Sequence, residues 1–357
     1  MKIKLGDLTR IKTGKLDANA SSPDGKYPFF TCSREPLRIN SYSYDCECVL
    51  VAGNGDLNVK YYNGKFDAYQ RTYIIEENGA GKLFLPYLYY FLDGYVEELR
   101  KLSIGGVIKY IKLGNLTDAL IELPDIQRQR AIVDILAKAK GIIDIRKQEL
   151  QSLENLIKAR FVEMFVGKNY PLMKIDDLSL GKGEYGAQSA SAEYDASRPR
   201  YIRITDINDD GTLNDDVVSS SNINDDVQYK LSYGDFLFAR MGATVGKTYA
   251  YKNGNQIYAG YLIRYKLNLE RITPEYLFAY TRLKEYWDWV LLNQSGAAQP
   301  GINAKKYGSL QVPVPPLNEQ RAFQEFVNQI DKSKVVVQKA LDGAQLLFDS
   351  MMQQYFG

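Results

Sequence analysis

The chain has 357 residues, of which 45% are hydrophobic and 25% charged, and its formal net charge at pH 7 is +2. This length allows two or three domains with sizeable cores, and the composition is that of an ordinary soluble globular protein. No run approaches the ~18 apolar residues of a membrane span, and the N-terminus lacks the apolar segment of a secretory signal, so a cytoplasmic protein is expected.

The composition also excludes whole classes of active site. The sequence contains no histidine, which removes Ser/His/Asp and Cys/His machinery and every histidine metal ligand. The three cysteines, Cys32, Cys46 and Cys48, are odd in number and two stand one residue apart, which is no disulfide framework. Because zinc usually takes four ligands from spaced Cys/His pairs, we interpret all three as strand residues and expect no metal or other cofactor in this chain.

Residues 1–122 have the pattern of a mixed α/β domain. The runs 47–52 and 70–75 are rich in strand-forming residues. Asn63-Gly64 lies between these runs and predicts a hairpin turn. Pro86 starts a helical pattern that continues through Phe91.

Residues 123–167 predict one long helix. Asp125 follows a proline and precedes a polar first turn, which is where an N-cap belongs. The run that follows has no proline and ends near Gly167, and its apolar residues recur at a spacing of three or four. They include Ile132, Ile135, Ala139, Ile142, Leu150, Leu153, Phe161 and Met164.

The rest of the chain repeats this organisation. Residues 168–313 form a second mixed domain with strand-like runs at 201–205, 235–239 and 261–265, a hairpin turn predicted at Asn253-Gly254, and a helix that starts at Pro274. Residues 314–357 form a second long helix with Asn318 as its expected N-cap. Its apolar positions include Phe323, Phe326, Ile330, Val337, Leu341, Ala344, Met351 and Tyr355.

An internal duplication accounts for this repetition, and internal repeats decide the fold. The Gln-Arg-Ala triplets that begin at Gln129 and Gln320 stand 191 positions apart. The pattern Ala-x-x-Gly-x4-Lys occurs from Ala52 to Lys60 and again from Ala239 to Lys247. The openings near Leu8 and Leu178, the helices at Pro86 and Pro274, and the Phe-Gly endings match in the same order. The fold class is therefore α+β, with a duplicated unit of one mixed α/β domain and one long helix.

The two long helices are expected to pair with each other. Some forty residues at 1.5 Å each give a helix of ~60 Å, and a helix of that length with one apolar stripe needs a similar partner. An antiparallel coiled coil would place the two domains at opposite ends. The alternative is that each helix packs separately on its own domain.

Two segments of the second domain are candidates for DNA contact. Gly242-Ala-Thr-Val-Gly-Lys247 resembles a phosphate-binding P-loop but is one residue short, so nucleotide binding is not expected. Its glycines with Arg240, Thr244 and Lys247 suit a DNA phosphate instead. Residues 295–303, Ser-Gly-Ala-Ala-Gln-Pro-Gly-Ile-Asn, carry Gln299 and Asn303, whose amides can pair with adenine, and Lys305 follows. For both segments the alternative is a plain turn without a ligand.

The remaining candidates for DNA contact belong to weaker sequence motifs. Arg198, Arg200 and Arg203 form a small basic cluster with an aromatic residue. In the first domain the matching positions are Asn54 and Lys60 of the glycine turn and Lys109 of residues 103–110, the counterpart of 295–303. There is no [ND]-P-P-[FYW] motif, no glycine-rich cofactor fingerprint, and no [DE]-x-Lys after Pro124-Asp125, so no catalytic residue is expected.

This chain resembles the specificity (HsdS) subunits of Type I restriction–modification systems over essentially its whole length. The resemblance is carried by the repeated helix starts, Leu-Pro-x-x-x-x-Gln-Arg-Ala and Val-Pro-x-x-x-x-Gln-Arg-Ala, by the Ala-Arg-Met-Gly-Ala-Thr-Val-Gly-Lys loop and by residues 295–303. In the first copy Gly53-Asn54 replaces the Arg-Met pair. The resemblance implies two target recognition domains that each read half of a bipartite DNA site. It implies that the helices set the gap and dock methyltransferase subunits, which carry S-adenosylmethionine, and that restriction subunits join that core.

Two other functions stay open on sequence grounds. One is a stand-alone specificity-like DNA-binding regulator, or the targeting arm of another modification enzyme. The other is an enzyme that works with carboxylates alone, for which two acids must face each other across a cleft.

Overall fold

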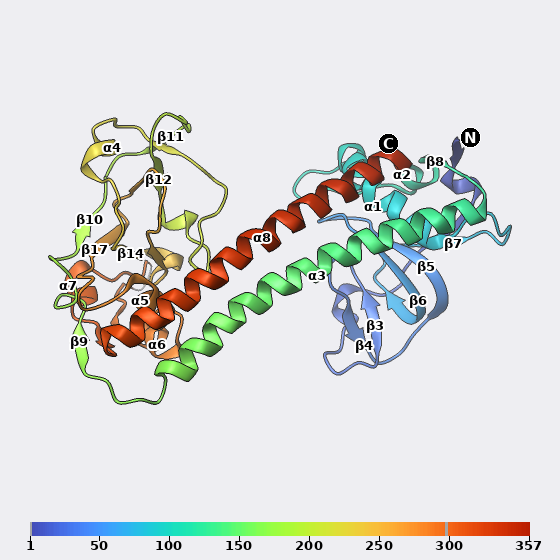
Figure 1. The fold of residues 1–357 in the computed structure, drawn as a ribbon. Coiled ribbons are helices and arrows are strands. Elements are labelled where there is room, and N and C mark those ends of the chain that lie inside the picture. Colours follow the sequence, from blue (N-terminus) through green and yellow to red (C-terminus); the bar gives the residue numbers. More distant parts are fainter. Residues whose placement is uncertain (1, 297–298) are drawn as a thin grey trace. The chain divides into compact units, whose positions relative to one another are not determined.

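In the computed structural model, residues 2–296 and 299–357 are described, and the chain divides into two compact units. Unit 1 comprises Met1–Gln148 and Val337–Gly357, and unit 2 comprises Glu149–Val336. Both ends of the chain therefore belong to unit 1 (Figure 1). Among the described helices, none combines the length and the apolar character needed to cross a bilayer.

Unit 1 is built on a six-stranded sheet in the order β2-β7-β5-β6-β3-β4, antiparallel except between β3 and β6. Alternate side chains of a strand point to opposite faces of its sheet. Val49 and Val51 accordingly join the core beneath the helix α1, whereas Cys48 and Leu50 join a second cluster on the other face. The strands are β2 (Thr9–Thr13), β3 (Tyr27–Phe30), β4 (Leu37–Ile39), β5 (Tyr44–Ala52), β6 (Val59–Ala68) and β7 (Thr72–Glu77).

The helix α1 (Leu85–Leu102) covers one face of this sheet with Leu88 and Leu92, both fully buried. It begins with a proline in its first turn, as the sequence predicts, because the missing N–H has no partner there in any case. The strands β1 (Lys2–Lys4) and β8 (Leu120–Glu122) pair antiparallel next to the start of the first long helix. The short elements are η1 (Leu5–Asp7), η2 (Ala18–Ala20) and α2 (Leu113–Thr117).

Unit 2 contains a four-stranded antiparallel sheet, β10-β17-β14-β15, and three two-stranded sheets, β11-β13, β12-β16 and β18-β9. The strand β14 (Asp235–Ala239) is entirely buried at the centre of the core. The other strands are β9 (Leu172–Lys174), β10 (Glu184–Tyr185), β11 (Ser191–Ala192), β12 (Arg200–Ile202), β13 (Ser219–Ser220), β15 (Thr248–Ala250), β16 (Gln256–Tyr258), β17 (Leu262–Lys266) and β18 (Gln311–Pro313). The short helices are η3 (Ile204–Asp206), α4 (Asp225–Gln228), η4 (Gly242–Thr244), α5 (Pro274–Tyr280), α6 (Lys284–Asn293) and α7 (Ala304–Gly308).

The duplication predicted from the sequence is present in the topology. The order β17-β14-β15 of unit 2 repeats β7-β5-β6 of unit 1, and the pair β18-β9 repeats β1-β8. Each unit is an α+β domain followed by a long helix.

Three local predictions are wrong, each because a longer-range partner decides the structure. Asn63 and Gly64 lie inside β6, paired with β5, and Gly64 takes the φ of 136° that this strand position requires. Asn253 and Gly254 do not close a hairpin, because β15 pairs with β14 while β16 pairs in parallel with β12. The strand predicted at 201–205 ends at Ile202, since Arg203 donates its backbone N–H to the Asp206 carboxylate and starts η3.

The two long helices are α3 (Ile126–Phe165) and α8 (Leu317–Phe356), each 40 residues, or ~60 Å at 1.5 Å per residue. Each helix contributes to both units, so neither packs only on its own domain. In unit 2 the end of α3 meets the start of α8, with the rings of Phe161 and Phe323 5.4 Å apart. In unit 1 the start of α3, at Leu136, shares a core with the end of α8, at Phe348. The pairing is antiparallel within each unit.

The starts of the two helices differ from each other. The Arg128 N–H donates to the Asp125 carboxylate at 2.8 Å, which confirms Asp125 as the N-cap of α3. Asn318 is not the N-cap of α8, because the helix begins at Leu317 and its first N–H groups donate to the Pro316 carbonyl instead.

A glutamine ties each long helix to its domain in the same way. The buried Gln129 accepts from the N–H of Phe84 at 2.8 Å and donates to the carbonyls of Lys82 and Pro124. The equally buried Gln320 accepts from Thr273 at 2.9 Å and donates to the carbonyls of Arg271 and Pro315. The Gln-Arg-Ala motif therefore anchors the helix.

The stripe of α3 expected from spacing is confirmed in unit 1 at Ile132 and Ala139 and is wrong at Ile135 and Ile142. Ile132, Leu136, Ala139 and Ile143 are buried, whereas Ile135 and Ile142 are 41% and 50% exposed. Two interleaved sets of apolar residues at helical spacing fit the same sequence, and only packing distinguishes them.

Candidate nucleic-acid interface

Two loops of unit 2 are linked by backbone hydrogen bonds and together form one edge of the unit. We call residues 240–242, after β14, the strand-end turn, and residues 295–301 the tip loop. The N–H of Gly242 donates to the Pro300 carbonyl at 2.9 Å, and that of Ile302 donates to the Arg240 carbonyl at 2.9 Å. The tip loop is closed by a reciprocal pair of backbone hydrogen bonds between Ser295 and Gly301. Residues 297 and 298, part of the predicted 295–303 segment, lie outside the described residues.

Unit 1 has the same edge, formed by a strand-end turn at 53–55 and a tip loop at 104–110. The N–H of Gly55 donates to the Lys109 carbonyl at 3.1 Å, and that of Ile111 donates to the Gly53 carbonyl at 2.9 Å. Ile104 and Tyr110 close the tip loop by two reciprocal hydrogen bonds. The structure thus confirms the predicted correspondence of the two loops, bond by bond.

Glycines make this geometry in both copies. Gly105 and Gly296 have φ of 119° and 108°, and a Cβ on either would lie 2.6 Å from a carbonyl oxygen of its own loop. Gly55 and Gly242 both have φ of 67° in the strand-end turns. A side chain at these positions would be strained, so the loop shape depends on glycine.

In unit 2, Arg240, Gln299 and Lys305 lie around this edge. The Arg240 guanidinium sits 4.8 Å from the ring centroid of Tyr185, and the Tyr185 hydroxyl accepts from the Ala304 N–H beside the tip loop. Gln299 and Lys305 are exposed. These three side chains can present a guanidinium, an amide and an ammonium group to a nucleic acid.

Three other predicted residues have their polar groups already in use. The Asn303 carboxamide oxygen accepts from the Lys306 N–H and caps α7, which removes the acceptor that a bidentate contact to adenine needs. The Thr244 hydroxyl donates to the Met241 carbonyl at 3.1 Å. Lys247 contacts the Ile207 carbonyl and pairs with Asp209 at 2.7 Å, and this hydrogen bond lowers the pKa of the Asp209 carboxyl.

The basic cluster predicted in unit 2 is bound to an acidic segment of the same unit. Residues 206–226 contain seven aspartates and no lysine or arginine. Arg198 makes two hydrogen bonds to Asp226, and Arg203 binds Asp206 and Asp216, which raises the pKa of the guanidinium further. Arg200 donates to the Asn214 carbonyl at 2.6 Å. These contacts fix the segment in place and leave little of the arginines for DNA.

In unit 1, the predicted residues also separate into free and engaged groups. Lys109 is exposed on the tip loop, and Asn54 is half-buried, with its backbone bridged to Tyr110. Lys60 donates to the Asn58 carboxamide, and burial lowers the pKa of its ammonium group. Lys60 therefore resembles Lys247, its counterpart, in having an intramolecular partner.

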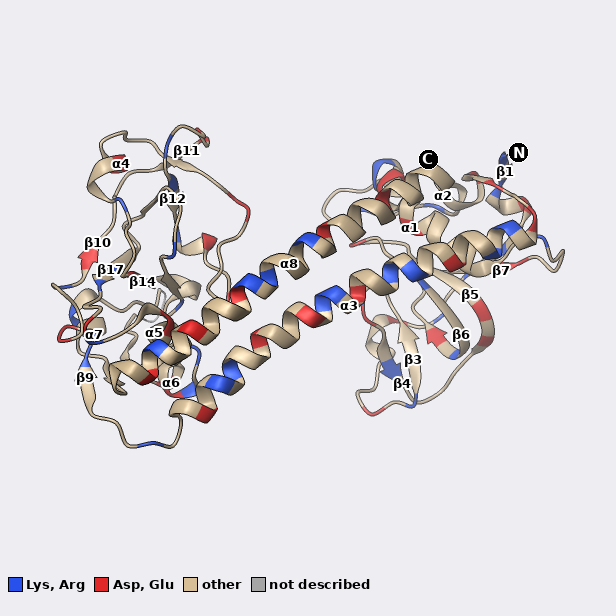
Figure 2. Ribbon diagram, in the orientation of Figure 1, with Lys and Arg blue, Asp and Glu red and all other residues tan. Residues whose placement is uncertain are grey.

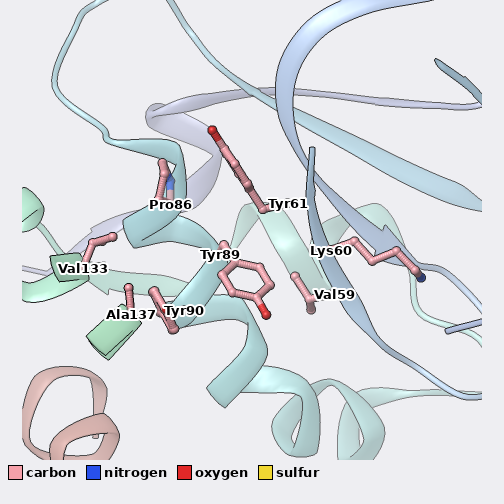
Figure 3. Close-up of a pocket in the computed structure, with 8 residues that line it drawn as sticks. All are labelled: Val59, Lys60, Tyr61, Pro86, Tyr89, Tyr90, Val133 and Ala137. Carbon is pink, nitrogen blue, oxygen red and sulfur yellow. The ribbon is translucent and has the colours of Figure 1, made fainter. Parts of the chain in front are cut away.

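Lys60 also lines a pocket of 510 Å³ in unit 1 (Figure 3). Tyr89, one of the residues that line the pocket, accepts a hydrogen bond from the ammonium group of Lys140 in α3. The lining is mainly aromatic and aliphatic, and it contains no carboxylate, so it offers no pair of facing acids. It consists of Val59, Lys60, Tyr61, Pro86, Tyr89, Tyr90, Val133 and Ala137.

The cysteines and acids do not assemble into a centre among the described residues, where no group of three or more Cys, Asp or Glu side chains is arranged to hold a metal ion. Cys46 and Cys48 lie in β5 as predicted, and burial raises the pKa of both thiols. Cys32 does not lie in a strand, contrary to prediction; it follows β3 in a bend.

Sequence reasoning missed two features of this edge. Tyr185, which supports Arg240, is 41% exposed on a strand of two residues, too short to show a pattern. Val107 and Ile108 on the unit 1 tip loop are 103% and 63% exposed, although an adjacent valine and isoleucine ordinarily indicate a buried strand. In the ribbon of Figure 2, positions of basic and of acidic residues are both spread along α3 and α8, so the long helices carry charges of both signs.

Comparison with known proteins identifies the family. The family model described as "Type I restriction modification DNA specificity domain" matches residues 1–155 and again 168–341. The Type I restriction enzyme EcoDI specificity subunit of Escherichia coli is 28% identical over 387 residues, covering 98% of this chain and 85% of that protein.

Two solved structures share the fold. The S subunit of a Type I restriction-modification system from M. genitalium aligns with a TM-score of 0.63 at 15% identity, covering 100% of this chain and 96% of that one. A chain from a study of complex assembly and conformational transition of the Type I R-M system aligns with a TM-score of 0.54 at 15% identity, covering 100% and 97%.

Proposed function

Because the chain belongs to the family of Type I restriction modification DNA specificity domains, we propose that each of its two domains reads one half of a bipartite DNA target. The chain is the DNA-recognition subunit of a Type I restriction–modification enzyme and is itself non-catalytic. One observation supports the proposal that both domains read DNA. Each unit joins a strand-end turn to a tip loop by equivalent hydrogen bonds, and the two units carry different side chains on these loops.

The proposed domain limits follow the sequence. Residues 1–122 and 168–313 are the two target recognition domains, and 123–167 and 314–357 are the spacer helices. We assign base contact in the second domain to Arg240 and Gln299, since an arginine or an amide can bind a base edge by two hydrogen bonds. Lys305 and, in the first domain, Lys109 are assigned to phosphates, which lysines contact without reading sequence.

The methyltransferase subunits are the partners of this chain. We propose that restriction subunits join that assembly. We assign the docking of the methyltransferase subunits to the long helices, which keep apolar side chains outside the cores of both units. Ile142 and Ile145 of α3 are 50% and 61% exposed in unit 1, and Val335 and Val336 of α8 are 55% and 68% exposed in unit 2. An exposed apolar patch is the kind of surface to which a protein partner docks, and these residues are our candidates for one. Because the proposed target is DNA, we propose that the protein acts in the cytoplasm.

The test is to map methylated adenines in cells that express this chain with its methyltransferase subunit. We expect one bipartite motif. Arg240→Ala or Gln299→Ala should relax one half of it, at a cost of about 1–3 kcal/mol in binding, and leave the other half unchanged. Lys305→Ala is the matched control, which should weaken methylation without changing the motif. An undivided motif, or relaxation of both halves by either variant, would contradict the proposal.

A further inference from the structure

The tip loop of unit 1 ends in two exposed apolar side chains. Val107 is 103% exposed, the highest value for a large apolar residue among those described, and Ile108 is 63% exposed. The loop that holds them is closed by hydrogen bonds between Ile104 and Tyr110 at 3.0 and 2.9 Å. A closed loop that presents valine and isoleucine to water gains nothing from their burial within the chain, which indicates that they contact something else.

The surroundings of this apolar tip are positively charged. Residues 99–117 contain Arg100, Lys101, Lys109 and Lys112 and no aspartate or glutamate. Arg100 and Lys101 pair with acids elsewhere in unit 1. Lys109 and Lys112 are exposed, and neither forms an ion pair within the described part of the chain. Two exposed apolar side chains followed by two exposed lysines fit a polyanion that carries an apolar group.

The equivalent position in unit 2 carries an amide. Ile108 and Gln299 stand 191 positions apart, the same offset as the Gln-Arg-Ala motifs. In each unit the carbonyl oxygen of this residue lies 2.6 Å from a Cβ built on the loop glycine, so Ile108 and Gln299 are related in the same way to the glycine of their own loop. An amide can pair with adenine, whereas an apolar side chain in the major groove can contact only the 5-methyl group of thymine.

We propose that Val107 and Ile108 read thymine in the first half-site through its 5-methyl group, with Lys109 and Lys112 on the flanking phosphates. The inference rests on the proposed function, because it assigns a base to the edge that this function uses. A protein partner is the competing occupant, since Leu102 and Ile104 at the base of the loop are also 41% and 42% exposed.

The test combines a change in the protein with the removal of one methyl group from DNA. The complex with methyltransferase subunits is titrated with duplexes carrying the mapped target, in which deoxyuridine replaces each thymine in turn. The unaltered protein should lose about fourfold in affinity at one or two positions of the first half-site, the factor for one apolar carbon removed from contact. Ile108→Ser or Val107→Ser should lose a similar factor on thymine DNA and nothing further on deoxyuridine DNA.

Two controls separate this inference from the proposed function. Ile108→Val keeps an apolar side chain and should keep the thymine preference, whereas Gln299→Ser should leave the response to deoxyuridine in the first half-site unchanged. If Ile108→Ser and deoxyuridine together reduce the affinity by the product of their separate factors at every position, the side chain and the methyl group do not contact each other. The inference is then wrong, while the proposal that each domain reads a half-site stands. The inference is equally wrong if the serine variants release the methyltransferase subunits in size-exclusion chromatography. If the unaltered complex shows no sequence preference at all, the proposed function itself fails.

Discussion

The two units share a backbone frame and differ in what they place on it. The strand-end turn and tip loop are held by equivalent hydrogen bonds in both, yet unit 1 presents Val107 and Ile108 where unit 2 presents Gln299. Unit 2 also holds additional chain, because Leu8 and Leu178 stand 170 positions apart whereas Ala52 and Ala239 stand 187 apart. Duplication has thus kept the glycines and the anchoring glutamines, and divergence has changed the exposed chemistry.

The largest change in stability is expected from the buried glutamines Gln129 and Gln320, which make equivalent hydrogen bonds in the two units. Gln129→Ala and Gln320→Ala should each destabilise their unit by more than about 3 kcal/mol, because each leaves one N–H and two carbonyls without their partner. Urea unfolding followed by tryptophan fluorescence measures Gln320→Ala, since Trp287 and Trp289 both lie in α6 of unit 2.

Hydrogen exchange at α1 measures Gln129→Ala in unit 1. Gln338→Ala is the matched control, because its exposed amide donates to Asp342 one turn away, and it should change stability by less than about 0.5 kcal/mol. If one anchor were dispensable, the two helices would not be attached to their domains in the same way.

Whether a feature could be predicted from the sequence depends on how far apart in the sequence the residues that determine it lie. The long helices and the Asp125 cap depend on residues close together in sequence, and the duplication shows in short motifs that recur in the same order, so all three could be predicted. The hairpin at Asn63-Gly64 was wrong because the pairing of β6 with β5 overrides a local turn preference. The partners of Arg198 and Arg203 lie up to 28 residues away in a segment that has no counterpart to compare, so their ion pairs were not foreseen.

The tip loops show the same division within the candidate site. The glycines and Gln299 could be selected from residue type and from the repeat. The outward position of Val107 and Ile108 could not, because composition favours burial and only the closed hairpin between Ile104 and Tyr110 turns them to solvent.

The next effect tests whether Arg203 belongs to the scaffold or to the DNA contacts. Its guanidinium faces the fully buried carboxylate of Asp206, and an unpaired buried charge costs about 3 kcal/mol or more. Arg203→Ala should therefore lower the urea midpoint of tryptophan fluorescence in unit 2 and leave the salt dependence of DNA binding unchanged. Lys305→Ala should do the reverse, with a drop of about one in the log–log salt slope and no loss of stability. If Arg203→Ala changed the salt dependence of DNA binding and left the stability unchanged, Arg203 would be a DNA-contacting residue and not part of the scaffold.

The smallest expected change in stability tests the shared frame itself. Gly105→Ala and Gly296→Ala place a Cβ 2.6 Å from a carbonyl oxygen at positive φ, a strain of about 1–3 kcal/mol that a loop of seven residues relieves by changing shape. Each variant should lose the sequence preference of its own half-site in methylation mapping and keep the other half intact. Gly106→Ala is the control within the same loop, because a Cβ there meets no atom within 4 Å and its φ is not positive, so both half-sites should persist. If Gly105→Ala changed the half-site that Gln299→Ala relaxes, or if Gly106→Ala were as damaging as Gly105→Ala, the two tip loops would not be independent reading elements, and the assignment of one half-site to each unit would have to be abandoned.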